Sequence, residues 1–208
     1  MKRCVIIGGA PINDYGFIKS KINEDDFIAV CDCGLRHLPH LCVEPDLIVG
    51  DFDSYEAPKA RCEIITLPCE KDDTDTFFAV KEALRRGFDE FLLLGVIGGR
   101  LDHSLGNISI LLYLDSLGKR ALACDDHSEI EIVSDNAAYI PDSYLYFSLL
   151  NVSGIARGIT IKNAKYPLEN ASIECEYQYG VSNETLKGKT AEVSVGEGRL
   201  LLIKIVKE

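Results

Sequence analysis

The 208-residue chain lacks a long hydrophobic run and has few basic residues for its size. No apolar stretch approaches the roughly 20 residues that a membrane-spanning helix needs. The chain carries 22 Lys and Arg against 33 Asp and Glu, for a net charge of −11. Nucleic acids and anionic membrane surfaces are bound by clustered basic residues, so neither partner is expected. A small cation, or an anion bridged by a metal, suits an acidic chain better.

The chain also lacks the cysteine spacing of zinc and redox sites. None of its eight cysteines forms a C-x-x-C pair, and Cys31-x-Cys33 is the closest approach to one. A chain of this length can bury enough core to fold without disulfides, so we expect free thiols. The apolar run near the N-terminus has about four residues, fewer than the roughly 7–15 of a signal-peptide core. We therefore expect a first buried strand at 3–8 and a cytoplasmic protein.

Short, continuous apolar runs alternate with helical patterns up to about residue 125. Such runs are typical of strands that are buried on both faces. Helices are expected at 74–86 and 102–117, because acidic residues precede each segment or open it and glycine follows its end. In the second helix, Leu101, Leu105 and Ile108 are expected to share the buried face with Leu111 and Leu112. The alternation predicts an open, parallel, Rossmann-like α/β domain. The expected strands lie at 4–7, 27–31, 47–49, 63–67, 91–94 and 121–124.

Beyond that point, long helical patterns disappear. Short segments rich in Ile, Val, Leu and Tyr alternate with turn residues. This texture predicts an antiparallel β-sandwich domain. We expect domains at 1–126 and 127–208, with strands at 130–134, 144–150, 158–161, 171–177, 190–195 and 200–205.

Candidate functional residues follow the predicted parallel strands, where open α/β sheets bind ligands. Gly8 and Gly9 end the first strand, and glycines let a backbone approach phosphate closely. A tight turn without ligand explains them equally well. Asp51 and Asp53 follow the third strand. Their spacing points both carboxylates the same way if the chain is extended, which suits Mg²⁺; a solvated turn is the alternative.

Two further loops carry charged residues beside helix starts. In Lys71-Asp72-Asp73-Thr74-Asp75, capping explains one Asp or Thr but not the full set. A helix N-terminus also favours phosphate oxygens, which Lys71 could contact directly and Asp75 through a metal. In Gly98-Gly99-Arg100-Leu101-Asp102-His103, Arg100 suits phosphate, and Asp102 caps the helix or completes a metal site. His103 is a catalytic candidate, with capping or simple exposure as the alternative. Together the loops predict Mg²⁺-assisted phosphoryl or pyrophosphoryl transfer.

This ordered set of motifs resembles the thiamine pyrophosphokinase family over nearly the whole chain. The motifs are Pro45-Asp46 with Gly50-Asp51-Phe52-Asp53-Ser54, then Asp72 with Thr74-Asp75, then Gly98-Gly99-Arg100 with Asp102-His103 and Asn107, then Lys165-Tyr166-Pro167-Leu168 and Val181-Ser182-Asn183-Glu184. The resemblance implies transfer of the pyrophosphoryl group of ATP to thiamine, giving thiamine diphosphate and AMP. It also implies a homodimer with thiamine bound where the subunits meet.

The resemblance assigns expected roles to individual residues. Asp51, Asp53, Asp75 and Asp102 are the expected catalytic residues and Mg²⁺ ligands, with Asp75 and Asp102 both open as the proton acceptor. The expected ATP-binding residues are Gly9, Asp32, Gly34, Lys71, Asp72, Thr74, Gly98, Gly99, Arg100, His103 and Asn107. Tyr166, Ser182 and Asn183 are expected near thiamine, where an aromatic face accepts the cationic thiazolium.

One departure from the family pattern concerns the second strand. Family members often have Ala-Asp-Gly-Gly-Ala there, whereas this chain has Cys31-Asp32-Cys33-Gly34-Leu35. Cys33 adds a Cβ, which puts close backbone approach to the nucleotide in question. Two other functions remain open from the residues: a pyrophosphokinase for another alcohol, such as a hydroxymethylpterin, and a non-catalytic nucleotide or thiamine sensor.

Overall fold

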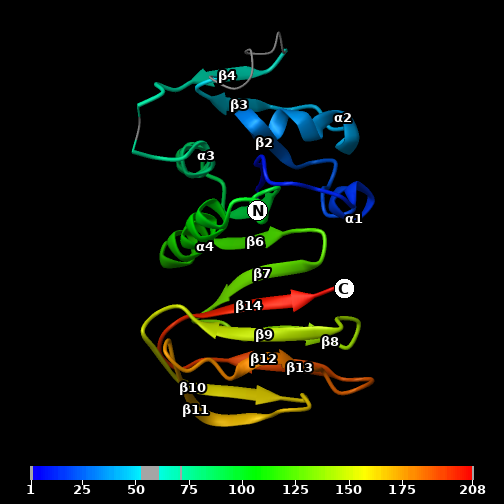
Figure 1. Ribbon diagram of the computed structural model, residues 1–208, viewed down its shortest axis with the longest axis vertical. Coiled ribbons are helices and arrows are strands. Elements are labelled where there is room, and N and C mark those ends of the chain that lie inside the picture. Colours follow the sequence, from blue (N-terminus) through cyan, green and yellow to red (C-terminus); the bar gives the residue numbers. More distant parts are fainter. Residues whose placement is uncertain (1, 53–60, 71, 208) are drawn as a thin grey trace. The chain divides into compact units, whose positions relative to one another are not determined.

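The computed structural model describes residues 2–52, 61–70 and 72–207. The chain divides into two compact units, Met1–Asp126 and His127–Glu208 (Figure 1). No helix in the described ranges combines the length and the apolar character that a membrane crossing requires. None of the eight cysteines takes part in a disulfide, as expected.

A parallel sheet of six strands forms the centre of the first unit. The strand order is β6-β5-β1-β2-β3-β4, and every neighbouring pair is parallel. The order changes direction between β1 and β5, so the loops after these two strands diverge. Open α/β sheets bind their ligands at such a switch point. The strands are β1 (Arg3–Ile7), β2 (Phe27–Cys31), β3 (Leu47–Gly50), β4 (Glu63–Thr66), β5 (Glu90–Leu94) and β6 (Arg120–Cys124).

Helices cover both faces of this sheet. On one face, Ile18 of α1 (Tyr15–Lys19) and Leu41 of α2 (Leu38–Leu41) belong to a buried cluster with Val30 of β2. Successive strand residues point to opposite faces, so Cys31 lies on the other one. There its thiol is 3.9 Å from the hydroxyl of Thr76 in α3 (Asp75–Arg85), which packs against β1, β2 and β3. Helix α4 (Leu101–Ser116) packs against α3 and β6.

The buried face of α4 differs from the predicted one. Leu101 and Leu105 are 72% and 60% exposed, although the pattern placed them with Leu111 in the core. The buried positions are Asn107, Ile110, Leu114 and, as predicted, Leu111. The start of the helix therefore extends away from the sheet, and leucine spacing alone could not reveal where its packing begins.

The second unit is a sandwich of two antiparallel sheets. The strand orders are β12-β9-β14-β7 and β11-β10-β13-β8. Side chains from both sheets form one core, in which Phe147, Leu149 and Leu202 meet Ile159, Ile173 and Val193. The strands are β7 (Ser128–Val133), β8 (Ala138–Pro141), β9 (Tyr146–Asn151), β10 (Ile155–Lys162), β11 (Leu168–Glu174), β12 (Gly180–Asn183), β13 (Thr190–Ser194) and β14 (Leu200–Ile205).

The predicted fold class is confirmed, and the elements missed by the pattern are short. Strands β8 and β12 have four residues each, and the register of β12 against β9 is irregular. Helices α1 and α2 and the 3₁₀ helix η1 (Asp32–His37) have no more than six residues. Periodicity needs a longer window than these segments offer.

Candidate active site

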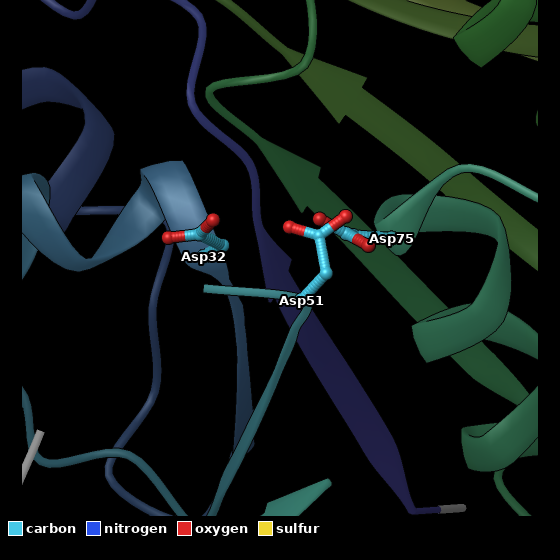
Figure 2. Close-up of side chains that lie close together, drawn as sticks. All are labelled: Asp32, Asp51 and Asp75. Atoms are coloured by element: carbon cyan, nitrogen blue, oxygen red, sulfur yellow. The ribbon is translucent and has the colours of Figure 1, made fainter. Parts of the chain in front are cut away.

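Three carboxylates converge at the carboxyl ends of the parallel strands. Asp32 begins η1, Asp51 follows β3, and Asp75 begins α3. One oxygen from each lies within 4.8 Å of the others (Figure 2). Like charges this close repel one another unless a cation lies between them. Hard carboxylate oxygens at this spacing fit Mg²⁺, which takes few protein ligands alongside phosphate and water.

Gly50 allows the backbone of β3 to reach Asp32. A Cβ added to Gly50 would lie 2.6 Å from the Cβ of Asp32, closer than real Cβ contacts. Any side chain at this position would therefore push η1 away from β3. Because Asp51 is the next residue, the glycine also sets the separation of Asp51 from Asp32.

A cavity of about 390 Å³, here called the first cavity, opens beside the cluster. It is lined by residues 9–11 after β1, by 95, 96 and 98–100 between β5 and α4, and by parts of η1, α3 and α4. These are the loops of the switch point. Asp75 belongs both to the cavity wall and to the carboxylate cluster. The arrangement places a cation site next to a glycine-lined hollow.

Arg100, which lines the first cavity, forms an exposed ion pair with Asp102. Nη2 and Nε of Arg100 donate to the two carboxylate oxygens of Asp102 at 2.5 and 3.1 Å. These hydrogen bonds are the main reason that the pKa of Asp102 is lowered to about 2. Asp102 is thus engaged with Arg100 and does not belong to the cluster of Asp32, Asp51 and Asp75.

Two buried side chains hold the cavity loops in place. Nε2 of His37 donates to the carbonyl oxygen of Ala10 at 3.0 Å, and Nδ1 lies 2.9 Å from the hydroxyl of Tyr15. A carbonyl only accepts, so the neutral imidazole carries its proton on Nε2 and accepts from Tyr15. Burial, chiefly, lowers the pKa of His37 and favours this neutral form. Asn107 donates to the carbonyl oxygen of Val96 at 2.6 Å.

A second cavity of about 360 Å³ lies between the starts of α3 and α4. It shares Thr74, Thr76, His103 and Asn107 with the first cavity. Its remaining wall carries carboxylates, hydroxyls and apolar groups, namely Asp72, Asp73, Asp102, Ser109, Phe77 and Ile110. Acidic groups beside an aromatic ring suit a cationic ligand.

In the second unit, Asn183 and Tyr166 are joined by two hydrogen bonds. The backbone N–H of Tyr166 donates to Asn183 Oδ1 at 3.0 Å, and Asn183 Nδ2 donates to the Tyr166 carbonyl at 2.8 Å. Asn183 is buried, whereas the Tyr166 side chain is exposed. Ser182 is exposed and adopts a φ of +56°, with its N–H donating to Ser148 Oγ. The buried amide therefore positions the tyrosine.

The structure places the other predicted residues as follows. Gly9, Gly98, Gly99 and Arg100 line the first cavity, and Gly98 and Gly99 have positive φ. Thr74 caps α3 by accepting from the N–H of Phe77. Gly34 packs within η1 against the Ile7 carbonyl. Asp53 and Lys71 lie outside the described residues.

Cys33 and Gly9 share one space. A Cβ on Gly9 would lie 2.4 Å from the Cβ of Cys33. The side chain of Cys33 therefore fits because Gly9 has none. Both residues line the first cavity, together with Arg36 and Thr76, which the sequence analysis did not select. Arg36 could have been selected from the sequence as a basic residue about one helical turn after Asp32.

Comparison with known proteins identifies the family. Residues 18–123 match the model "Thiamin pyrophosphokinase, catalytic domain", and residues 129–200 match "Thiamin pyrophosphokinase, vitamin B1 binding domain". The chain belongs to the thiamine pyrophosphokinase family. The thiamine pyrophosphokinase of Bacillus subtilis (strain 168) is 28% identical, covering 98% of this chain and 99% of that protein. As a family member, the protein is an ATP-dependent diphosphotransferase.

Solved structures of thiamine pyrophosphokinases share the fold. The Bacillus subtilis structure has a TM-score of 0.87 at 25% identity, with full coverage of both chains. The Geobacillus thermodenitrificans structure has a TM-score of 0.84 at 27% identity, covering 99% of this chain and 98% of that one. These matches confirm the predicted resemblance and its main function, and they do not support the hydroxymethylpterin or sensor alternatives.

Proposed function

We propose that this protein transfers the pyrophosphoryl group of ATP to the hydroxyethyl oxygen of thiamine, giving thiamine diphosphate and AMP. The observation that carries the proposal is the cluster of Asp32, Asp51 and Asp75 beside the first cavity, at the switch point of the sheet. Membership of the thiamine pyrophosphokinase family supports the choice of donor and acceptor. Transfer of this kind depends on positioning and on charge neutralisation.

Asp32, Asp51 and Asp75 would hold Mg²⁺ in this proposal. The bound ion would neutralise negative charge on the triphosphate. The predicted metal roles of Asp53 and Asp102 remain predictions. Asp102 would act chiefly through Arg100, whose guanidinium it orients by two hydrogen bonds.

Residues of the first cavity would hold and orient ATP. The glycine-rich loops after β1 and β5 bring backbone close to the phosphates, and Arg100 adds a fixed positive charge. The acceptor hydroxyl must also lose a proton. The pKa of Asp102 is lowered to about 2, chiefly by its hydrogen bonds from Arg100, and such a carboxylate accepts protons poorly.

The thiamine cation would enter from the acidic side of the site. The second cavity adjoins the first and carries Asp72, Asp73 and Phe77, which suit a cationic ring. In the second unit, Tyr166, Ser182 and Asn183 remain the predicted thiamine contacts. The Tyr166 ring already has a cation over its face, because Lys165 Nζ lies 5.6 Å from its centroid.

The decisive experiment measures AMP formation by the purified chain from ATP and Mg²⁺, with and without thiamine. We expect AMP and thiamine diphosphate in equal amounts, loss of both after chelation with EDTA, and recovery when Mg²⁺ is added. A hydroxymethylpterin serves as the alternative acceptor. Absence of thiamine-dependent AMP would overturn the proposal.

The proposed homodimer, with its active site at the subunit interface, has a separate test. Light scattering coupled to gel filtration should give twice the chain mass. At limiting Mg²⁺ and thiamine, the weakly active variants Asp75→Asn and Tyr166→Leu should recover activity when they are mixed, because one composite site in the mixed dimer is intact. A monomeric mass, or no recovery on mixing, would contradict the shared site. The cytoplasmic location stays a prediction.

A further inference from the structure

Arg36 is a second arginine on the wall of the first cavity. It lies near the end of η1, is exposed, and packs its guanidinium against the loop after β1. A Cβ on Gly9 would lie 3.3 Å from Nη2 of Arg36. The glycine thus leaves room for the guanidinium beside the cavity.

The two arginines of this cavity differ in their charge environment. Arg100 is already bound to both carboxylate oxygens of Asp102. Within residues 2–52, 61–70 and 72–207, Arg36 forms neither a hydrogen bond nor an ion pair. Its guanidinium is therefore available to a bound anion, whereas Arg100 already has a carboxylate partner.

One short element connects Arg36 to the carboxylate cluster. Asp32 starts η1, and Arg36 follows four residues later, about 8 Å along a 3₁₀ helix that rises about 2.0 Å per residue. The next residue, His37, is buried and hydrogen-bonded to the carbonyl of Ala10. The element is thus anchored, and its backbone holds the spacing between residue 32 and residue 36.

We propose that Arg36 binds the triphosphate of the nucleotide in the first cavity; this inference rests on the proposed function. A guanidinium matches phosphate oxygens with two parallel N–H donors. ATP is an anion and the protein is acidic, so binding is opposed by electrostatic repulsion. The guanidinium of Arg36 would reduce that repulsion. Arg36 and Asp32 then act on the same triphosphate from one anchored element, with Asp51 and Asp75 completing the cluster from β3 and α3.

The test measures binding by calorimetry, independently of turnover. The ligands are α,β-methylene-ATP with Mg²⁺, and adenosine, each titrated into the unaltered chain and into Arg36→Gln. We expect the variant to bind the triphosphate analogue about ten- to a hundredfold more weakly, because a charge-assisted contact is lost. Affinity for adenosine should not change. Arg36→Lys keeps the positive charge but loses the paired N–H donors of the guanidinium. Its affinity for the triphosphate analogue should lie between those of the unaltered chain and Arg36→Gln.

Arg61→Gln is the matched control, since it removes the same charge elsewhere. Arg61 is exposed and precedes β4, whereas the cavity lies at the carboxyl ends of the strands. It should bind both ligands normally. Equal loss of adenosine binding in Arg36→Gln would assign Arg36 to the base instead and overturn the inference.

The inference and the proposed function fail in distinguishable ways. Unchanged affinity of Arg36→Gln for the triphosphate analogue, in a protein that releases AMP with thiamine, would overturn the inference alone. Absence of nucleotide binding by the unaltered chain would overturn both.

Discussion

Gly50 packs so closely on Asp32 that a Cβ at Gly50 would lie 2.6 Å from the Cβ of Asp32. Gly50→Ala should therefore displace η1 and with it one carboxylate of the cluster. Small misplacements of catalytic groups cost on the order of 100-fold in rate, and we expect a loss of that size in thiamine-dependent AMP release.

Gly16→Ala is the control for this substitution. Gly16 lies in α1, where the nearest heavy atom to an added Cβ is 3.4 Å away. Activity should be normal, and the free energy of unfolding should rise by up to about 1 kcal/mol, because alanine is the better helix former. Full activity of Gly50→Ala would show that the contact does not set the cluster.

The carboxylate cluster predicts a metal requirement that depends on Asp51 and Asp75. Replacing either by Asn keeps the shape but removes a hard anionic ligand, so the Mg²⁺ concentration for half-maximal activity should rise at least about tenfold. Asp25→Asn, at an exposed carboxylate between α1 and β2, should leave it unchanged. Calorimetric titration with Mg²⁺ alone should show weaker Mg²⁺ binding by the variants at Asp51 and Asp75 than by Asp25→Asn. Equal Mg²⁺ requirements in all three variants would exclude the cluster as the metal site.

The hydrogen bond from His37 to Ala10 predicts a positioning role for the imidazole. His37→Phe should raise KM for ATP more than KM for thiamine, because the Ala10 loop lines the first cavity. It should also cost about 1–3 kcal/mol of stability by leaving a partly buried carbonyl without its donor. Tyr15→Phe leaves that bond in place and should have a smaller effect on both. A loss of stability with an unchanged KM for ATP would show that His37 has a structural role only.

Tyr166 is predicted to contact the thiamine cation through its ring. Tyr166→Leu should raise KM for thiamine about two- to thirtyfold, the range of a cation–π contact of about 0.5–2 kcal/mol, and leave KM for ATP unchanged. Tyr166→Phe keeps the aromatic face and should stay close to normal. Tyr139→Leu, at an exposed tyrosine of the same unit, is the control. Identical kinetics of the two leucine variants would argue against the contact.

The ionised carboxylate of Glu82 is expected to make the stability of the first unit depend on pH. Hydrogen bonds from Arg85 first, and also from Arg86, lower the pKa of Glu82 to about 2. Because the folded pKa lies below the unfolded value, this contribution to stability is present above about pH 4.5 and is lost as the pH falls towards about 2. Glu82→Gln should therefore lower Tm near neutral pH, with the difference shrinking in acid. A constant difference across this range would contradict the assigned cause.

Much of the fold could be predicted because its signals are local. The strands at 27–31 and 47–49 are continuous apolar runs. Helix α3 has Asp75 in its first turn and ends before Gly87, so short windows identify all three. Asp51 and Asp75 could be named because each adjoins such an element. Four-residue strands such as β12, and the packing of α4, could not be predicted, since neighbours distant in the sequence decide them.

The sequence by itself determined which chemical groups end the strands of the sheet, because chain order places Asp51, Asp75 and Arg100 directly beside strand and helix signals. Only the tertiary structure decided which of these groups meet. The parallel strand order brings Asp32 to Asp51 and Asp75, whereas Asp102 pairs with Arg100 and Arg36 faces the cavity without a described ion-pair partner. The physical reason is that side-by-side packing of β2 and β3, and of the elements after them, is a long-range property that no local spacing encodes.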